Sequence, residues 1–393
     1  MVSEALALHS KLRGKLSVES KLKINSKKDL SLAYTPGVAE PCIEIARDKK
    51  RVYEYTIKGN TVAVITDGTA VLGLGDIGPS ASLPVMEGKA LLLKEFAGID
   101  SFPIVLDTKD VDEIVRTIKI ISPGFGGINL EDISAPRCFA IEEKLQDMGI
   151  PVMHDDQHGT AVVVYAALIN ALKVVRKKMN EINVVINGAG AAGSAIAKIL
   201  LGIDSNNRDN NSVRNVLIVD SKGIIGKERN DLDEYKKKLA ETTNKGNLSG
   251  NLADALKGAD VFIGVSKGNV VSKEMIKSMA KNPIVFARAN PVPEIMPVDA
   301  ISAGAAVVGT GRSDFPNQIN NVLAFPGIFK GALDAKATKI TPKMKLAAAI
   351  ALANCVDSPT KDNILPDPID KTVALKVAQA VKEVAIEENN TRK

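Results

Sequence analysis

The sequence predicts an α/β protein, on three observations. Short β-rich runs alternate with amphipathic helical stretches along the chain, which is the pattern of α/β folds. A glycine-rich segment at residues 188–193 stands between one such run and an alanine-rich helix. Hydrophobic residues make up 45% and charged residues 25% of the 393 residues, which excludes wholesale disorder and supplies enough apolar side chains for two or three domain cores.

The first half of the chain predicts a series of strands and helices. We expect strands at 61–66 (TVAVIT), 102–106 (FPIVL) and 150–153, and helices at 85–96 and 137–148. A polar cluster, HDDQHGT, fills residues 154–160 and precedes an apolar helix at 161–175. We place a domain boundary in or just after this cluster, so the predicted domains are residues 1–158 and 159–393.

The second half predicts another β/α series. We expect strands at 182–186, 216–219, 261–265, 284–286 and 306–308, and a helix at 191–201. Residues 204–212 are rich in Asn, Asp and Ser and predict a surface loop. Residues 227–245 predict a solvated helix with a loop, and residues 371–388 an amphipathic helix that follows two prolines.

Composition and charge exclude several classes of function. Lysine and arginine exceed aspartate and glutamate by only five, aromatic residues are 4% and tryptophan is absent, so we expect no nucleic-acid partner. The three cysteines lie far apart and form no CxxC pair, which favours a reducing cytoplasm over a disulfide framework. One of the longest apolar runs, residues 161–169, is far shorter than the ~20 residues that span a bilayer, so we expect no membrane association.

The glycine-rich segment predicts a dinucleotide site. It follows a strand and opens a helix, which is the context in which GxGxxG cradles a pyrophosphate. The first glycine makes the turn, the second lets the backbone approach the phosphates, the third packs the helix on the strand, and the helix N-terminus offers free N–H groups. The candidate contacts are Gly188, Ala189, Gly190, Ala191, Ala192 and Gly193. The alternative is a structural turn.

Asp220 ends the next predicted strand, where a carboxylate can accept a hydrogen bond from the ribose 2′-hydroxyl of NAD. It follows Gly193 by 27 residues, more than the usual ~20, and the loop at 204–212 accounts for the excess. The ammonium of Lys222, two residues on, could instead reach the 2′-phosphate of NADP. We therefore expect both NAD and NADP to bind, with a modest preference for NAD.

Two acidic pairs predict a metal site. Glu131 and Asp132 follow a glycine-containing apolar run, and Asp155 and Asp156 follow a predicted strand. Carboxylates that converge at strand ends suit a hard divalent cation, Mg²⁺ or Mn²⁺. The neighbouring histidines, His154 and His158, leave zinc as a weaker alternative, and helix caps or solvated loops would explain each pair without a metal.

Two further residues are acid–base candidates. Lys89 lies in an apolar helical stretch, where burial and a nearby cation would lower its pKa and make it a base; the alternative is a surface lysine. Tyr34 lies in the turn sequence YTPG, which could direct its ring into a cleft, or it could be a core tyrosine.

These motifs resemble the prokaryotic, short-form malic enzymes, which lack a fused acyltransferase domain. The matching segments include LSLAYTPGVAEPC, LPVMEGKALLLKEFAGID, FGGINLEDISAPRC, HDDQHGTA, NGAGAAG, ANPVPEI and GRSDFPNQINNVLAFPGIF, in chain order. The resemblance implies an N-terminal α/β substrate and metal domain, then a Rossmann-type dinucleotide-binding domain with C-terminal helices. It also implies NAD(P)-dependent oxidation of L-malate to oxaloacetate and decarboxylation to pyruvate, with Mg²⁺ or Mn²⁺.

The resemblance assigns roles to individual residues. Lys89 becomes the general base, which takes the proton of the C2 hydroxyl, and Asp155 the partner that orients it. Tyr34 becomes the general acid that protonates C3 of enolpyruvate. The implied metal ligands are Glu131, Asp132 and Asp156, and the implied contacts to substrate and nicotinamide are Lys89, Asn290, Asn320 and Asn321.

Two positions depart from the family pattern. Larger members carry a substrate-binding arginine after the TDG motif, where this chain has Ala70. Another cation must then neutralise the distal carboxylate of malate. Two residues before Asn290, where an apolar residue is usual, stands Arg288. Its charge either reaches solvent at the strand end or meets a phosphate.

Two alternative functions stay open: a malolactic or oxaloacetate-decarboxylating reaction with bound NAD and no net redox change, and a non-catalytic nucleotide-binding protein. The resemblance also implies a homodimer. The apolar N-terminal stretch with Leu6, Leu8 and Leu12 could contribute to its contact.

Overall fold

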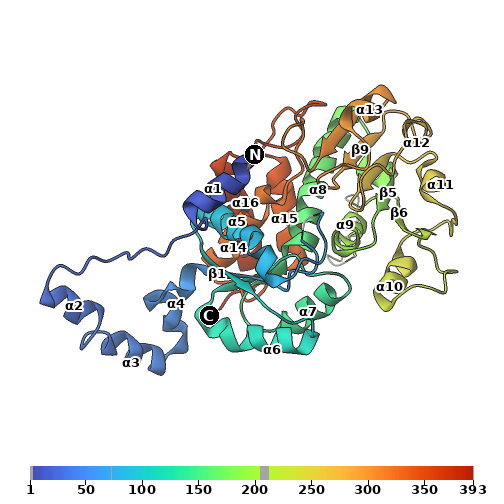
Figure 1. Cartoon of the computed structure of the whole chain (residues 1–393). Helices are drawn as coiled ribbons and strands as arrows, with labels where there is room; N and C mark the ends of the chain where they lie inside the picture. Colours follow the sequence, from blue (N-terminus) through green and yellow to red (C-terminus); the bar gives the residue numbers. More distant parts are fainter. Residues whose placement is uncertain (1–2, 72, 204–211, 393) are drawn as a thin grey trace.

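The computed structural model describes residues 3–71, 73–203 and 212–392, and it contains two β-sheets with helices on their faces (Figure 1). The α/β class predicted from the sequence is confirmed. Nearly all of the predicted loop at 204–212 lies outside the described residues.

The N-terminal sheet is parallel and has the order β2-β1-β3-β4. Its strands are β1 (Thr61–Thr66), β2 (Asp100–Val105), β3 (Gly127–Leu130) and β4 (Val152–His154). One face packs on α6 (Val111–Ile121) and α7 (Arg137–Leu145), and the other on α5 (Pro79–Ala97) and α8 (Asp155–Val175). Because all four strands run in the same direction, their carboxyl ends share one edge, and the acidic residues that follow β3 and β4 meet there.

The second sheet has the order β10-β9-β8-β5-β6-β7, with only β7 antiparallel. Its strands are β5 (Asn183–Asn187), β6 (Asn215–Asp220), β7 (Gly223–Ile224), β8 (Val261–Gly264), β9 (Ile284–Ala287) and β10 (Val307–Thr310). Five short helices accompany it: α9 (Ala191–Leu201), α10 (Glu234–Thr242), α11 (Leu252–Leu256), α12 (Lys273–Lys277) and α13 (Pro297–Ser302). The order places the glycine-rich turn after β5 between β6 on one side and β8 on the other, as dinucleotide binding requires.

The C-terminal helices connect the two halves. They are α14 (Phe325–Asp334), α15 (Pro342–Ala353) and α16 (Lys371–Glu387), and they share one hydrophobic core with α5 and α8 (Figure 1). Gly327 and Gly331 let α14 lie against α16, because a Cβ at Gly327 would stand 2.7 Å from the carbonyl oxygen of Ala374. The predicted boundary at residue 158 falls inside α8, and the division into two domains stays a prediction.

Helix α8 is long and apolar enough to cross a membrane by length and composition, but 72% of the window concerned is buried inside the protein. It is the central core helix of the fold.

The start of α8 corrects a prediction: the helix begins at Asp155, six residues before the predicted start at 161, so most of the polar cluster is helical. Carboxylates in a first helical turn interact favourably with the helix dipole, which explains this earlier start.

An N-terminal arm projects from the rest of the chain (Figure 1). After α1 (Glu4–Leu12), Lys15 anchors the chain to α5 through a 3.0 Å hydrogen bond from its backbone N–H to Glu87. The arm, residues 22–50, contains α2 (Lys27–Ala33) and α3 (Ala39–Arg47), and neither helix has a buried residue. Within the described ranges, no hydrogen bond or ion pair joins the arm to any residue beyond 60. The chain returns through α4 (Val52–Tyr55) to β1.

Candidate functional site

Lys89 is the centre of a buried charged cluster. It extends from α5, and its Nζ donates to Asp155 Oδ2 at 2.5 Å and lies 3.0 Å from Glu131 Oε1. Asn321 donates its side-chain N–H to the same Asp155 oxygen at 2.8 Å. Gly159, one helical turn after Asp155, leaves room for this carboxylate, because a Cβ there would collide with Asp155 Oδ1. The structure thus joins Lys89, Asp155, Glu131 and Asn321, all named from the sequence.

The charged groups in this cluster shift one another's pKa values. Burial lowers the pKa of Lys89, but the carboxylates of Asp155 and Glu131 outweigh this effect and raise it above the ordinary value. The sequence analysis expected burial and a nearby cation together to lower this pKa; burial acts in that direction, and the combined effect with a cation stays a prediction. Burial also raises the pKa of Glu131 and of Asp155, and the neighbouring lysine opposes this. A cation that neutralised the acids would weaken their hold on the lysine proton.

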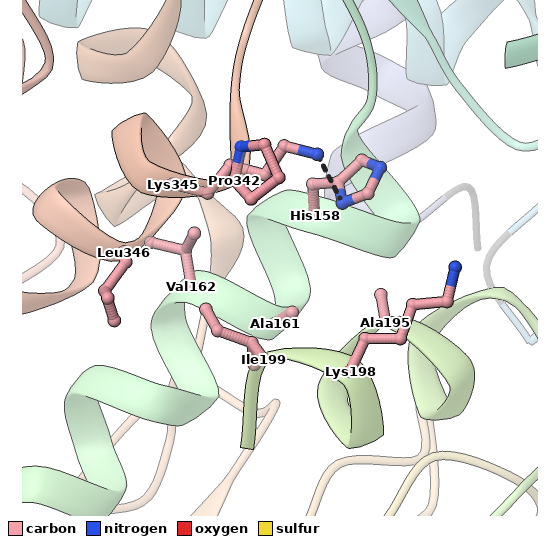
Figure 2. A pocket seen from close by; sticks show the side chains of 9 residues that line it. All are labelled: His158, Ala161, Val162, Ala195, Lys198, Ile199, Pro342, Lys345 and Leu346. Atoms are coloured by element: carbon pink, nitrogen blue, oxygen red, sulfur yellow. Dashed lines mark hydrogen bonds between the residues drawn. The ribbon is translucent and has the colours of Figure 1, made fainter. Parts of the chain in front are cut away.

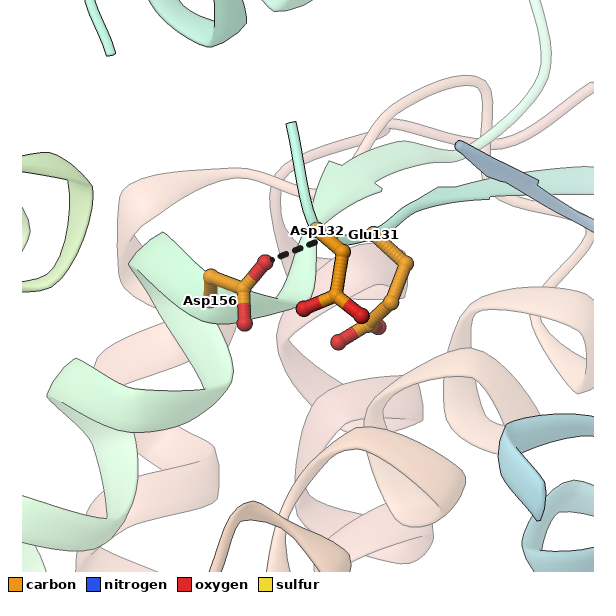
Figure 3. Close-up of side chains that lie close together, drawn as sticks. All are labelled: Glu131, Asp132 and Asp156. Atoms are coloured by element: carbon orange, nitrogen blue, oxygen red, sulfur yellow. Dashed lines mark hydrogen bonds between the residues drawn. The ribbon is translucent and has the colours of Figure 1, made fainter. Parts of the chain in front are cut away.

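Glu131, Asp132 and Asp156 form a second cluster beside the first. Each offers one carboxylate oxygen, and these oxygens lie within 4.8 Å of one another (Figure 3). Asp132 follows β3 with a left-handed φ of 52°, and its backbone N–H donates to Asp156 Oδ2 at 2.8 Å, so this hydrogen bond joins the two acidic segments. Three carboxylates at this separation repel one another, and an all-oxygen donor set suits Mg²⁺ or Mn²⁺. The residues present fit the predicted metal.

The two histidines take no part in that donor set. His158 Nε2 lies 2.9 Å from Glu142, and its Nδ1 lies 3.1 Å from the Lys345 ammonium (Figure 2). His154 is fully buried, with its Nε2 3.4 Å from Asp156. The oxygen cluster favours Mg²⁺ or Mn²⁺ over the zinc alternative.

Glu142 on α7 is a buried residue that the sequence analysis did not identify. It accepts hydrogen bonds from the backbone N–H of His154 at 3.0 Å and from the side chain of Gln157 at 3.1 Å, besides its contact with His158. Burial acts to raise the pKa of Glu142, but His158 and Lys345 lower it to about 2. This carboxylate therefore holds the start of α8, and with it Asp155 and Asp156, in place. Its only sequence signal was an acid on a predicted amphipathic helix.

Tyr34 does not join these clusters within the chain. It lies at the C-terminal end of α2 on the arm, and it is 67% exposed. Its backbone makes only local hydrogen bonds, with Leu30 and Val38. Its exposure shows that the alternative of a core tyrosine is wrong, and its role as general acid stays a prediction.

The glycine-rich turn has the geometry that a dinucleotide needs. Gly188 has a φ of 129°, and a Cβ there would lie 2.6 Å from the carbonyl oxygen of Val265. A Cβ at Gly193 would collide with the carbonyl oxygen of Gly188, so this glycine lets α9 approach β5. A Cβ at Gly190 would meet no atom within 4 Å, so the backbone there is open to a ligand. The three glycines thus match the roles of a pyrophosphate-binding turn.

Asp220 stands at the end of β6, as predicted, but between two cations that the sequence analysis did not identify. Arg229 donates to it at 2.8 Å and Lys236 at 3.0 Å. Burial acts to raise the pKa of Asp220, but these partners lower it below the ordinary value. The ammonium of Lys222 lies 3.0 Å from Asp231. The positive charge beside Asp220 therefore comes mainly from Arg229 and Lys236.

The remaining predicted contacts lie at the ends of β9 and α14. Asn290 follows β9 and is exposed, close to Gly311 after β10. Asn320 accepts a hydrogen bond from the N–H of Val322 at 3.0 Å and so caps the turn before α14. The side chain of Glu294 accepts from the N–H groups of Ala289 and Ser266, at 3.0 Å and 3.1 Å, and fixes the loops after β9 and β8. Contacts of Asn290 and Asn320 with substrate or nicotinamide stay predictions.

Comparison with known proteins places this geometry in a family. Residues 13–146 match the model of the malic enzyme N-terminal domain, and residues 157–386 that of the malic enzyme NAD-binding domain. The bifunctional malic/malolactic enzyme of Bacillus subtilis is 58% identical over 98% of this chain and 93% of its own length. The NAD-dependent malic enzyme of Geobacillus stearothermophilus is 54% identical over 97% of this chain and 78% of its own length. The crystal structure of the NAD-dependent malic enzyme of Thermotoga maritima superposes with a TM-score of 0.91 at 51% identity, covering 97% of this chain and 99% of that one.

Proposed function

The chain belongs to the malic enzyme family, whose members oxidise and decarboxylate L-malate with NAD or NADP, and we propose which of its residues carry out this reaction. The observation that supports the proposal best is the Lys89 ammonium, held between Asp155 and Glu131 beside the three-carboxylate cluster. A base candidate and a metal site thus lie together at the carboxyl edge of a parallel sheet. L-malate presents both a hydroxyl proton to remove and oxygen atoms for a metal.

Lys89 is the general base. Its Nζ takes the proton of the C2 hydroxyl, and Asp155, fixed by Asn321, holds that nitrogen in position. Glu131, Asp132 and Asp156 hold Mg²⁺ or Mn²⁺, which when bound supplies Lewis-acid polarisation of the substrate oxygens. The turn from Gly188 to Gly193 would hold the pyrophosphate of NAD or NADP, and the bound dinucleotide would supply the hydride acceptor.

The general acid comes from a second copy of the chain. Tyr34 lies on an arm that, among the described residues, forms no hydrogen bond or ion pair with any residue beyond 60 and that exposes apolar side chains. These include Leu22, Ile24, Leu30, Leu32 and Ile43, each between 49% and 67% exposed. An extended apolar segment of this kind marks a contact surface. In a homodimer, the arm of one subunit covers its partner and supplies Tyr34 to protonate C3 after CO₂ leaves.

The direct test of the proposed function is an absorbance assay with L-malate, Mn²⁺ and either NAD or NADP. We expect net formation of reduced cofactor with both, faster with NAD, because Asp220 accepts from a 2′-hydroxyl while Arg229 and Lys236 reduce its repulsion of a 2′-phosphate. A chelator should stop the reaction, and added Mn²⁺ should restore it. No reduced cofactor from either dinucleotide would contradict the proposal.

The malolactic reaction is the second candidate, because the Bacillus subtilis relative is named for both activities. In that case L-malate yields lactate and CO₂ without net reduced cofactor, and analysis of the organic acid formed, lactate or pyruvate, separates the malolactic from the oxidative reaction.

We place the protein in the cytoplasm, consistent with three free cysteines, Cys42, Cys138 and Cys355.

A further inference from the structure

The proposed site has too little positive charge for a dicarboxylate. The charges of three carboxylates act on Lys89, those of Asp155, Glu131 and Asp156, and Asp132 lies beside Glu131 and Asp156. The position that carries a substrate-binding arginine in larger members of the family is Ala70 here, and its backbone N–H donates to the carbonyl oxygen of Asp132 beside the cluster. A divalent cation and Lys89 together do not balance these acids, so a substrate dianion needs a further cation.

Arg288 stands where such a cation is needed. It directly follows β9, and its backbone N–H donates to the carbonyl oxygen of Gly264 at the end of β8. Its Nε donates to the carbonyl oxygen of Ile319 at 3.4 Å. Ile319 lies two residues before Asn321, which bonds Asp155. The short segment 319–321 therefore contacts the Arg288 guanidinium at one end and the cluster around Lys89 at the other.

The terminal nitrogens of Arg288 are available to a ligand. In the described part of the chain the side chain forms no ion pair, and its one hydrogen bond is the contact of Nε with Ile319. The two terminal nitrogens have no hydrogen-bond partner among the described residues, and both keep solvent-accessible surface. The neighbouring Arg312 differs, because it is paired with Asp314 at 2.6 Å and bonds the carbonyl oxygen of Pro291.

The charges around Arg288 also favour an anionic ligand at this side chain. Burial lowers the pKa of Arg288 to about 10, and the carboxylates that oppose this are those of Glu294, Asp155 and Asp156. Asp155 and Asp156 belong to the proposed catalytic site, so the charges of that site act on this guanidinium. A half-buried, charged guanidinium without an ion-pair partner is stabilised by a carboxylate ligand, which its planar fork can bind through two hydrogen bonds.

The sheet order separates this position from the phosphates of the dinucleotide. The glycine-rich turn follows β5, whereas Arg288 follows β9, two strands away in the order β9-β8-β5. Neighbouring strands lie about 4.8 Å apart, so the two strand ends are separated by roughly 10 Å. Asp220 follows β6 on the opposite side of β5, so Arg288 lies away from the adenosine side.

We propose that Arg288 binds the distal carboxylate of the 2-hydroxy dicarboxylic acid substrate, in place of the arginine that is absent at Ala70. This assignment rests on the proposed function of the site. Arg288 is then a specificity residue: it distinguishes malate from 2-hydroxy monocarboxylic acids such as lactate, which have the same hydroxyl and C1 carboxylate. Because it contacts the substrate before CO₂ leaves, it contributes mainly to substrate binding and little to turnover.

The test measures binding of L-malate and of L-lactate by calorimetry to the full-length protein with Mn²⁺ and NADH, where no turnover occurs. Arg288→Gln should weaken malate binding about 10- to 100-fold, the loss expected for a charge-assisted pair, and leave lactate binding unchanged. Arg288→Met should do the same, and Arg288→Lys should fall between. Arg116→Gln, an exposed arginine on α6, removes the same charge and should change neither constant. In assays, Arg288→Gln should raise KM for malate by the same factor and change kcat less than about threefold.

Unchanged malate binding would overturn the assignment. So would equal losses for malate and lactate, or a matching loss of NADH affinity measured by its fluorescence, since these would place the guanidinium at a shared group or at the cofactor. Failure of the proposed function looks different: the unaltered protein would form no reduced cofactor from malate, while the two binding constants could still be compared.

Discussion

Replacing Lys89 by alanine is expected to reduce malate oxidation about 10²- to 10⁴-fold, the typical loss for a missing general base. The lysine is the only described ammonium or guanidinium within 4 Å of Asp155 or Glu131, so no neighbour among the described residues replaces it as proton acceptor. The measurement is kcat for L-malate under saturating Mn²⁺ and NAD. Binding of NADH, at the distant turn after β5, should remain.

A control on the same helix separates chemistry from folding. Lys94 pairs with Asp100 at the surface, 54% exposed, so Lys94→Ala removes an equal charge from α5 away from the site and should leave kcat near normal. Removal of Lys89 leaves Asp155 buried without its cation, so thermal unfolding should be recorded in parallel. A folded Lys89→Ala protein with near-normal turnover would show that another group is the base.

Asp156→Asn is expected to raise the Mn²⁺ or Mg²⁺ concentration needed for half-maximal activity by more than the ~10- to 100-fold typical of residues that only support a metal ligand. The change replaces one anionic oxygen by a neutral amide, whose oxygen can still accept the N–H of Asp132. The local fold should therefore survive. Direct Mn²⁺ titration by calorimetry should show the same loss without reference to catalysis.

The matched control is Asp112→Asn, at an exposed carboxylate on α6 that pairs with Lys144. It should leave metal affinity unchanged. A chelator should inactivate the unaltered protein reversibly. Full activity after complete metal removal, or unchanged Mn²⁺ affinity in Asp156→Asn, would refute the assignment of the three carboxylates.

Local sequence patterns predicted the nucleotide turn and eight of the ten described strands; β3 and β7 were missed. Helix α9 begins and ends at the predicted residues 191 and 201, because the glycines before it and Gly202 after it limit the helix at both ends. The acids at the ends of β3 and β4 converge because parallel strands share one edge, which is a topological rule. For the nucleotide turn, α9 and the two acidic pairs, the local sequence pattern and the observed fold agree.

Tertiary contacts determined what the sequence did not reveal. Besides the acids of its own first turn, Glu142 on another helix stabilises the early start of α8, because it accepts a hydrogen bond from the backbone N–H of His154. Arg229 and Lys236 lie in a stretch that had the charge pattern of a solvated helix, and only the fold brings them to Asp220. The helices that were not predicted as separate elements are α1 to α4, α6 and α11 to α15.

Tyr34 illustrates a different limit. The YTPG motif identified a residue with a family role, but the sequence carries no information on which copy of the chain the ring serves. The structure places it at the C-terminal end of α2, on an exposed arm that projects away from α5, the helix that carries Lys89. Its proposed role as general acid therefore rests on the proposed homodimer.

The claim that one catalytic site is built from two chains is tested most directly by mixing two inactive variants, Lys89→Ala and Tyr34→Phe. The subunits are unfolded and refolded together in equal amounts, and light scattering checks that dimers form. If Tyr34 acts in the partner's site, each mixed dimer contains one site with both residues intact, and the mixture should regain about a quarter of the unaltered turnover. If Tyr34 and Lys89 of the same chain acted together, every site would lack one of them, and a mixture no more active than the separate variants would contradict the account.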